Sequence, residues 1–200
     1  MSFAVKNKPQ TALIHAPRRA PQYIETVQPP LFRASTIIFN NTDALFNRHW
    51  TDAYDYSYGT HGTPTTFTLG DNIAQIEGGI YSLLAPSGLS AINLVNSCFL
   101  SQGDEVWVAD NIYGPNMEHL RNLESRYGIH VKVYNSLDVS SFNPSSKAKL
   151  IWLEAAGSVT LEFPDLAGLV KKAKAQNILT ALDNTWGAGL AFNAFDFGDE

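Results

Sequence analysis

The sequence predicts an α/β protein whose mostly parallel sheet is covered by helices on both faces. From residue 69 onward, short apolar runs typical of strands alternate with segments whose apolar residues recur at helical spacing. Several of these runs end in polar residues, as expected where strands finish at a ligand-binding edge. Hydrophobic residues make up 44% of the 200-residue chain, which is enough to fill a sizeable core.

The first part of the chain differs from this regular region. Residues 1–40 hold many of the prolines and show no sustained periodicity, which predicts an arm that lies on its own body or on a partner subunit. Thr42 is expected to cap a short helix over residues 43–49. We therefore expect an arm with a first helix at residues 1–45 and a large domain at residues 46–200.

The regular region predicts one element after another. A helix is expected where apolar residues at helical spacing are followed by a glycine stop (Leu69, Ile73, Ile76, Gly78). Strands are then expected at 80–85, 105–109, 129–134, 150–154 and 178–182, and helices at 89–100, 116–127 and 165–176. Repeated β-α-β units bring the carboxyl ends of parallel strands to one edge, where open α/β sheets bind ligands.

The stretch 178–189 ends its strand on Asp183, followed by Asn184, Thr185 and Trp186. A carboxylate at this edge could form a salt bridge with a cationic ring nitrogen, such as a protonated pyridine, and raise the pKa of that nitrogen. A simple turn capped by Asp183 and Asn184 is the alternative interpretation.

A second polar turn, at residues 85–90, precedes an expected helix. Its backbone N–H groups, the helix dipole and the hydroxyls of Ser87 and Ser90 could bind a phosphate. An ordinary capped turn explains the same residues. The sequence contains neither GxGxxG nor GxxxxGK[ST], which argues against a dinucleotide or nucleoside-triphosphate site.

Two further strand ends carry candidate residues. Tyr113 could stack its ring on a planar cofactor and offer its hydroxyl for proton transfer, although loop aromatics often serve packing alone. Glu154 and Ser158 face the same predicted edge, and Glu154 has a simple alternative role as an anchor of its loop. We assign no metal ligands.

Composition narrows the partners. The net charge of -5 and the pI near 5.5 argue against a nucleic-acid surface. The sequence has no lysine or arginine cluster beyond the three lysines at 171, 172 and 174, which lie on one expected helix. The single cysteine, Cys98, fits a reducing compartment, and its apolar pattern predicts burial. The chain shows no signal-peptide core and no run of ~20 apolar residues, so we expect a cytoplasmic protein without a membrane segment.

The ordered motifs resemble a known family, the pyridoxal-phosphate (PLP) enzymes of cysteine and methionine metabolism, of fold type I. The resemblance rests on YSYGTHGTPT (56–65), QIEGG (75–79), PSGLSA (86–91), QGDEVWVADNIYGP (102–115), LEAAGSVTLE (153–162) and LDNTWGAGLAFNAFDFG (182–198). Trp186 and the Gly157–Thr160 segment resemble the cystathionine β-lyase branch; the γ-synthase and γ-lyase branch usually has phenylalanine and Asn-Pro there.

The resemblance implies roles for individual residues. Asp183 matches the aspartate that pairs with the pyridine nitrogen, and Tyr113 matches the tyrosine that stacks on the ring and transfers protons. Gly88 and Leu89 match the backbone amides under the phosphate. The hydroxyl residues Ser87, Ser158 and Thr185 complete the cofactor-binding set expected within this domain.

The resemblance also implies that two subunits build each site, in a homo-oligomer that is a tetramer in the family. Tyr58 matches a tyrosine that reaches the phosphate of the neighbouring subunit's cofactor. Two residues later the family usually has an arginine, whereas this chain has Thr60, followed by His61. Losing that charge-assisted bond would weaken phosphate binding by ~1.5–3 kcal/mol, so we expect weaker cofactor retention.

A second departure concerns the lysine that forms the internal Schiff base in the family. That lysine follows the DNTW segment in a Ser-x-Thr-Lys context, and the last lysine of this chain is Lys174, on an upstream helix. We therefore expect the amino-terminal half of an enzyme, inactive by itself. The implied activity of the whole is β-elimination from cystathionine, giving homocysteine, pyruvate and ammonia in methionine biosynthesis. The alternatives are an enzyme of the γ branch and a non-catalytic truncated subunit.

Overall fold

The computed structural model describes residues 8, 11, 14, 28–49 and 56–198, and contacts divide the chain into two compact units, 1–84 and 85–200. Most of the expected arm lies outside the described residues. Within the described ranges, no helix is long and apolar enough to cross a membrane.

The first unit contains helices α2 (Thr42–Phe46) and α3 (Pro64–Glu77). The cap of α2 is Asn41, whose side chain accepts a hydrogen bond from the Ala44 N–H at 2.8 Å, so the prediction of Thr42 as the cap was wrong by one residue. A capping box opens α3, and the expected glycine stop is confirmed at Gly78, which has a φ of 79°.

The segment expected as a strand at residues 80–85 is not one. Ile80 is 95% exposed and Leu83 is 78% exposed, and the segment has no strand pairing. In the described part of the chain, this segment is held by one side-chain hydrogen bond, which the Ser82 hydroxyl donates to the Gly70 carbonyl at 2.8 Å. An apolar run becomes a strand only where another strand edge pairs with it, which is why the sequence pattern misled.

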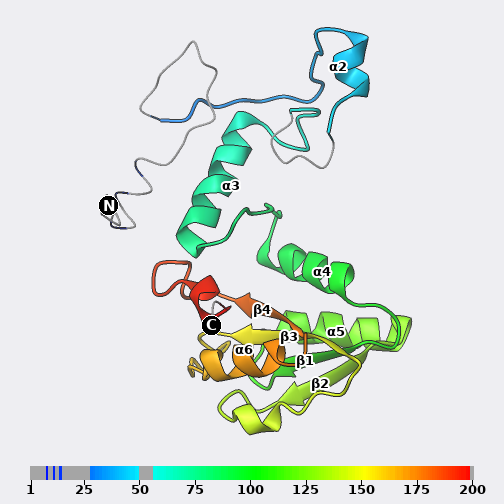
Figure 1. The fold of residues 1–200 in the computed structure, drawn as a ribbon, viewed down its shortest axis with the longest axis vertical. Coiled ribbons are helices and arrows are strands. Elements are labelled where there is room, and N and C mark those ends of the chain that lie inside the picture. Colours follow the sequence, from blue (N-terminus) through cyan, green and yellow to red (C-terminus); the bar gives the residue numbers. More distant parts are fainter. Residues whose placement is uncertain (1–7, 9–10, 12–13, 15–27, 50–55, 199–200) are drawn as a thin grey trace. The chain divides into compact units, whose positions relative to one another are not determined.

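The second unit contains a four-stranded parallel sheet, which confirms the predicted fold class (Figure 1). Its spatial order is β2-β1-β3-β4, and the strands are β1 (Glu105–Ala109), β2 (His130–Tyr134), β3 (Ala148–Glu154) and β4 (Leu179–Asp183). Its helices are α4 (Gly88–Phe99), α5 (Gly114–Tyr127) and α6 (Leu166–Lys174), with 3-10 turns η1 (Val139–Ser141) and η2 (Ala194–Gly198). All three helices and all four strands overlap their predicted ranges.

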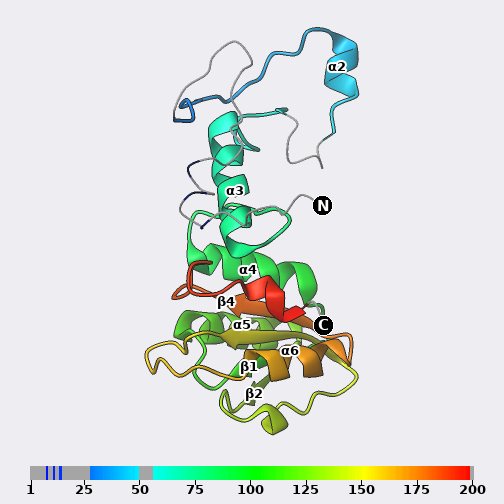
Figure 2. The same cartoon turned by 60° about the vertical axis from the view of Figure 1, so that its left-hand side comes forward.

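Helices cover both faces of this sheet, as two views of the ribbon show (Figure 2). Side chains alternate along each strand between two buried clusters. On one face, Val106, Val108 and Trp152 pack with Ile92 of α4 and Leu120 of α5. On the other face, residues of β1 and β3 pack with α6 and with Phe142 (Trp107, Ile151, Leu153, Leu169, Val170).

Buried polar contacts fix α4 and α5 to the sheet. The Asn96 amide donates to the Asn116 side-chain oxygen at 3.1 Å, and the Trp152 indole donates to the Asn96 side-chain oxygen at 2.8 Å. All three residues are buried. Because α4 turns Ile92 and Asn96 inward, Cys98 lies on another side of the helix and is exposed, so the prediction that it is buried was wrong.

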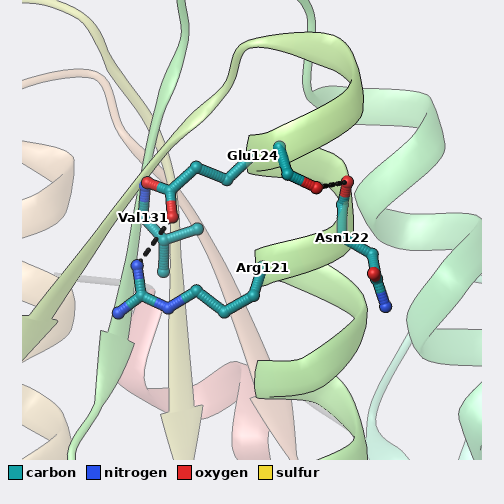
Figure 3. Close-up of polar contacts among 5 residues, drawn as sticks. Arg121, Asn122, Glu124 and Val131 are labelled. Carbon is teal, nitrogen blue, oxygen red and sulfur yellow. Dashed lines mark hydrogen bonds and ion pairs between the residues drawn. The ribbon is translucent and has the colours of Figure 1, made fainter.

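The end of α5 is tied to the start of β2. Glu124 accepts hydrogen bonds from the Val131 N–H at 2.9 Å and from the Arg121 guanidinium at 2.8 Å (Figure 3). The Glu124 carboxylate therefore links the last turns of α5 to the edge strand β2.

Candidate cofactor site

The candidate residues of the second unit lie at the carboxyl edge of the sheet. Helix α4 leads through residues 100–104 into the start of β1, so it runs opposite to the strands and its first turn lies over their carboxyl ends. Glu154 ends β3 and Asp183 ends β4. By strand alternation, both side chains project to the face that α4 and α5 cover.

The start of α4 presents unpaired donors. Ser87 is the N-cap, and its hydroxyl accepts from the Ser90 N–H at 3.1 Å. Among the described residues, the N–H groups of Gly88 and Leu89 have no partner, as is usual in the first turn of a helix. A Cβ placed on Gly88 would meet nothing within 4 Å, so the space beside these donors is open. The turn therefore fits an anion such as a phosphate.

Tyr113 is placed by its backbone. It is the N-cap residue of α5, and its N–H donates to the Glu154 carboxyl at 2.6 Å. The side chain is 39% exposed, and its hydroxyl has no partner in the described part of the chain. Tyr113 is therefore free to contact a ligand through both its ring and its hydroxyl.

Two carboxyl groups lie side by side at this edge. Glu154 is directly opposite Asp183 in the register of β3 and β4, and Glu154 is only 5% exposed. Burial raises the pKa of Glu154 to about 7; the Asp183 charge also raises it, whereas the Tyr113 N–H lowers it. Neither carboxyl forms an ion pair with a described lysine, arginine or histidine. The pair therefore fits a cationic group such as a protonated ring nitrogen.

Loop contacts complete the edge. The N–H of Thr185 donates to Asp183 Oδ1 at 3.0 Å, and the Thr185 hydroxyl donates to the same oxygen, so Asp183 Oδ2 stays available. Ser158 is half-buried, and its N–H donates to the Asn111 carbonyl at 3.0 Å, which ties the loop after β3 to the loop after β1. Ser87, Gly88, Leu89, Tyr113, Ser158, Asp183 and Thr185 thus share one edge.

Tyr58 and Thr60 belong to the first unit. Tyr58 pairs with Thr36 in an isolated antiparallel bridge, and its hydroxyl lies 3.2 Å from that of Ser35. Gly59 between them has no room for a side chain, because a Cβ would lie 1.8 Å from the Ala34 carbonyl oxygen. Thr60 is exposed. Their expected role toward a neighbouring subunit stays a prediction.

The sequence pattern undervalued one residue, Glu154. The sequence placed it at the candidate edge, with loop anchoring as the alternative, and gave it no defined role in the site; the structure places its carboxyl against the Tyr113 backbone and beside Asp183. Two strands that each end in a carboxylate were the available signal. The pattern contained nothing to show that these two strands are neighbours.

A parallel sheet covered on both faces, with a helix start and acidic side chains at its carboxyl edge, defines a ligand-binding α/β protein. Residues 10–200 match the model of the Cys/Met metabolism PLP-dependent enzyme family. The chain belongs to this family, whose cofactor is pyridoxal phosphate.

Its curated relatives include proteins of different described activities. The chain is 30% identical to the cystathionine beta-lyase of Escherichia coli over 198 residues, which cover 96% of the chain and 50% of the relative. It is 35% identical to the cystathionine beta-lyase of Bordetella avium, over 84% of the chain and 43% of the relative. It is also 32% identical to an L-alanine/L-glutamate racemase of Wolbachia pipientis, over 96% and 50%. The chain thus spans about half the length of these relatives.

Solved structures show the same fold. The cystathionine gamma-lyase of Lactobacillus plantarum in complex with L-serine matches with a TM-score of 0.84 and 25% identity, over 96% of this chain and 48% of that one. A Campylobacter jejuni protein described as an O-acetylhomoserine (thiol)-lyase matches with a TM-score of 0.85 and 22% identity, over 96% and 48%; it carries N'-pyridoxyl-lysine-5'-monophosphate.

Proposed function

We propose that this chain is the cofactor-binding half of a PLP-dependent carbon–sulfur lyase that acts on cystathionine or another β-thio-substituted amino acid. The observation that carries the proposal is the carboxyl edge of the sheet, where a helix start with open N–H donors shares a face with two carboxyls that have no cationic partner among the described residues. The resemblance of Trp186 and Gly157–Thr160 to the β-lyase branch supports β-elimination, which would release homocysteine, pyruvate and ammonia in methionine biosynthesis.

Each residue has a separate task in this proposal. Bound pyridoxal phosphate supplies a protonated ring that withdraws electrons from the α-carbon of an attached amino acid. Asp183 keeps the ring nitrogen protonated through its available oxygen, and the Gly88 and Leu89 N–H groups bind the phosphate, with Ser87 as the cap. Tyr113 stacks on the ring and moves a proton with its hydroxyl. Ser158 and Thr185 complete the cofactor-binding set, and their backbone N–H groups also hold the surrounding loops in place.

A base must also remove the α-proton, and no lysine of the second unit lies at this edge. These lysines lie on α6, in β2 or at the start of β3. Lys174 is exposed at the end of α6, a helix that runs opposite to β4, so it lies toward the amino edge and on the other face of the sheet. We therefore propose that the base comes from residues outside these 200, and that the 200 residues by themselves are inactive.

The first unit would complete the site in a homo-oligomer. In this proposal, Tyr58 reaches the phosphate in a neighbouring subunit, and Thr60 in place of an arginine weakens its retention. Dialysis followed by measurement of residual cofactor tests this step; retention as tight as in arginine-bearing relatives would contradict it. An exposed free thiol at Cys98 agrees with a reducing, cytoplasmic compartment.

Product analysis tests the reaction. The 200-residue chain and the full reading frame that contains it would each be incubated with pyridoxal phosphate and cystathionine. We expect pyruvate and free thiol from the full reading frame and neither from the 200 residues alone. Formation of 2-oxobutyrate would indicate the γ branch, and no product from either protein would indicate a non-catalytic subunit.

Amino-acid racemisation is a second candidate, favoured by the 32% identity to the Wolbachia racemase. It needs the same removal of the α-proton but no leaving group on the β-carbon. Incubation with L-alanine and chiral analysis of the product separate the two activities. Interconversion of alanine enantiomers without pyruvate release from cystathionine would replace the lyase proposal.

A further inference from the structure

Glu154 connects two residues of the candidate site. Its carboxyl accepts the Tyr113 N–H at 2.6 Å, although the two residues are 41 positions apart in the sequence. In the β3–β4 register it lies opposite Asp183, so both side chains project to the same face. Glu154 is 5% exposed, which shields this contact from water. One buried carboxyl therefore contacts the backbone of the stacking residue and neighbours the carboxylate assigned to the ring nitrogen.

Few groups influence the pKa of Glu154. Burial and, to a smaller extent, the Asp183 charge raise its pKa to about 7, although the Tyr113 N–H bond favours the ionised form. From β2, Tyr134 donates its hydroxyl to the Trp152 carbonyl at 3.0 Å; burial, Asp110 and Glu154 all raise the Tyr134 pKa, so this phenol stays neutral. Asp183 is thus the charged group that acts on the ionisation of Glu154, in addition to burial and the Tyr113 N–H.

We propose that Glu154 is a positioning residue that couples the two halves of the site: a cation held by Asp183 strengthens the hydrogen bond by which Glu154 fixes Tyr113. The inference rests on the proposed function for the identity of that cation, the protonated ring nitrogen. Its physical basis is local. Compensating the Asp183 charge favours ionised Glu154, and a hydrogen bond to an ionised carboxylate is roughly twice as strong as one to a neutral carboxyl.

Through this coupling, binding of a cation at Asp183 fixes the position of Tyr113. Before a cation arrives, the raised pKa favours protonated Glu154 in mildly acidic solution, and this neutral carboxyl holds the Tyr113 N–H weakly. When a cation neutralises Asp183, the Glu154 proton leaves to solvent and the Tyr113 backbone is held more firmly. The stacking ring is therefore fixed in position as the ring nitrogen is bound.

Amide hydrogen exchange at Tyr113, measured at about pH 6, tests this without an activity assay. We expect Glu154→Leu to expose the Tyr113 N–H and speed its exchange roughly five- to tenfold, the loss of one hydrogen bond. Glu154→Gln keeps an acceptor and is expected to exchange at nearly the wild-type rate. Glu162→Gln is the matched control: it removes one carboxylate from the same loops, where Glu162 accepts from the Asn111 amide at 3.1 Å, and should leave Tyr113 unchanged.

The coupling itself is tested by Asp183→Asn in the cofactor-free protein. Removing this charge should favour ionised Glu154 and slow Tyr113 exchange roughly two- to fivefold, and the effect should vanish in the double variant Asp183→Asn, Glu154→Gln. Unchanged exchange in Asp183→Asn, or an equal effect in the double variant, would overturn the coupling. Because this variant does not depend on Glu154→Leu, a misfolded Glu154→Leu protein leaves the test intact.

Added pyridoxal phosphate separates this inference from the proposed function. We expect it to slow Tyr113 exchange in the wild type and to leave Glu154→Gln unaffected. If absorbance titration shows that the cofactor does not bind, the proposed function fails, while the cofactor-free comparison still decides the role of Glu154. Equal slowing in both proteins would show binding without the coupling.

Discussion

Two buried glutamates at opposite edges of the same sheet behave differently. Glu105 begins β1 and is 7% exposed, whereas Glu154 ends the neighbouring strand β3 and is 5% exposed. Burial by itself acts to raise the pKa of each glutamate. At Glu105, hydrogen bonds from Trp107 and Ser145 and the charge of Lys132 outweigh burial and lower the pKa. At Glu154, one N–H donor and a neighbouring carboxylate leave the pKa at about 7.

The difference shows what distinguishes a structural carboxylate from one in a candidate site. Glu105 accepts from the Trp107 indole at 2.5 Å and from both the N–H and the hydroxyl of Ser145 at 3.2 Å. Three hydrogen bonds from within the fold thus stabilise its ionised form. Glu154 accepts a single hydrogen bond, and neither Glu154 nor Asp183 has an ion-pair partner among the described residues, as expected where a ligand supplies a positive charge.

The largest expected effect comes from removing the structural carboxylate. Glu105→Ala leaves the buried Trp107 indole and the Ser145 donors without an acceptor and should lower the free energy of unfolding by about 3 kcal/mol. Glu154→Gln keeps its acceptor and should change it by less than about 1 kcal/mol at pH 4.5, where Glu154 of the folded wild type is protonated. Chemical denaturation of both variants measures this. Similar losses for the two variants would remove the distinction between the edges.

The contributions of Glu154 and Glu105 to the free energy of unfolding should depend on pH with opposite signs. The raised pKa of Glu154 means that its contribution is fully present below its unfolded pKa of 4.5 and is lost as the pH rises to about 7. The stability of the wild type relative to Glu154→Gln should therefore fall across this window by up to ~3 kcal/mol, at about 1.4 kcal/mol per pKa unit. The lowered pKa of Glu105 gives a contribution that is present above 4.5 and lost in acid.

Denaturation curves at a series of pH values for the wild type, Glu154→Gln and Glu105→Gln check both signs. The difference between the wild type and Glu105→Gln should change only below pH 4.5. A flat difference between the wild type and Glu154→Gln from pH 4.5 to 7 would show that Glu154 titrates normally.

Removing a single hydrogen-bond donor from Glu105 should shift its pKa toward that of Glu154, with a smaller loss of stability. Ser145→Ala removes one of the three described donors, the hydroxyl, and keeps the backbone N–H. We expect a loss of about 1 kcal/mol and a higher Glu105 pKa, because burial is then opposed by fewer hydrogen bonds. Ser140→Ala is the matched control, since its hydroxyl donates to the exposed Asp138. Equal acid sensitivity in the two serine variants would count against this account of Glu105.

The sequence predicted the parts of the fold that follow from local pattern. Periodicity located the helices and strands of the second unit, and polar strand ends located the candidate edge. It failed at residues 80–85, where an apolar run has no strand to pair with, and at Cys98, whose side of α4 depends on where Ile92 and Asn96 point. The contact between Glu154 and Tyr113 was out of reach because it depends on spatial strand order, which the sequence order does not give.

Equilibrium binding of pyridoxal phosphate, followed by absorbance, tests the central claim that the ring nitrogen is held by Asp183. We predict that the wild type binds and that Asp183→Asn binds at least roughly tenfold more weakly, from the loss of a charge-assisted bond. Asp110→Asn is the matched control, because it removes the same charge directly after β1 at the same edge and should bind like the wild type. Wild-type affinity in Asp183→Asn, or an equal loss in Asp110→Asn, would contradict the account.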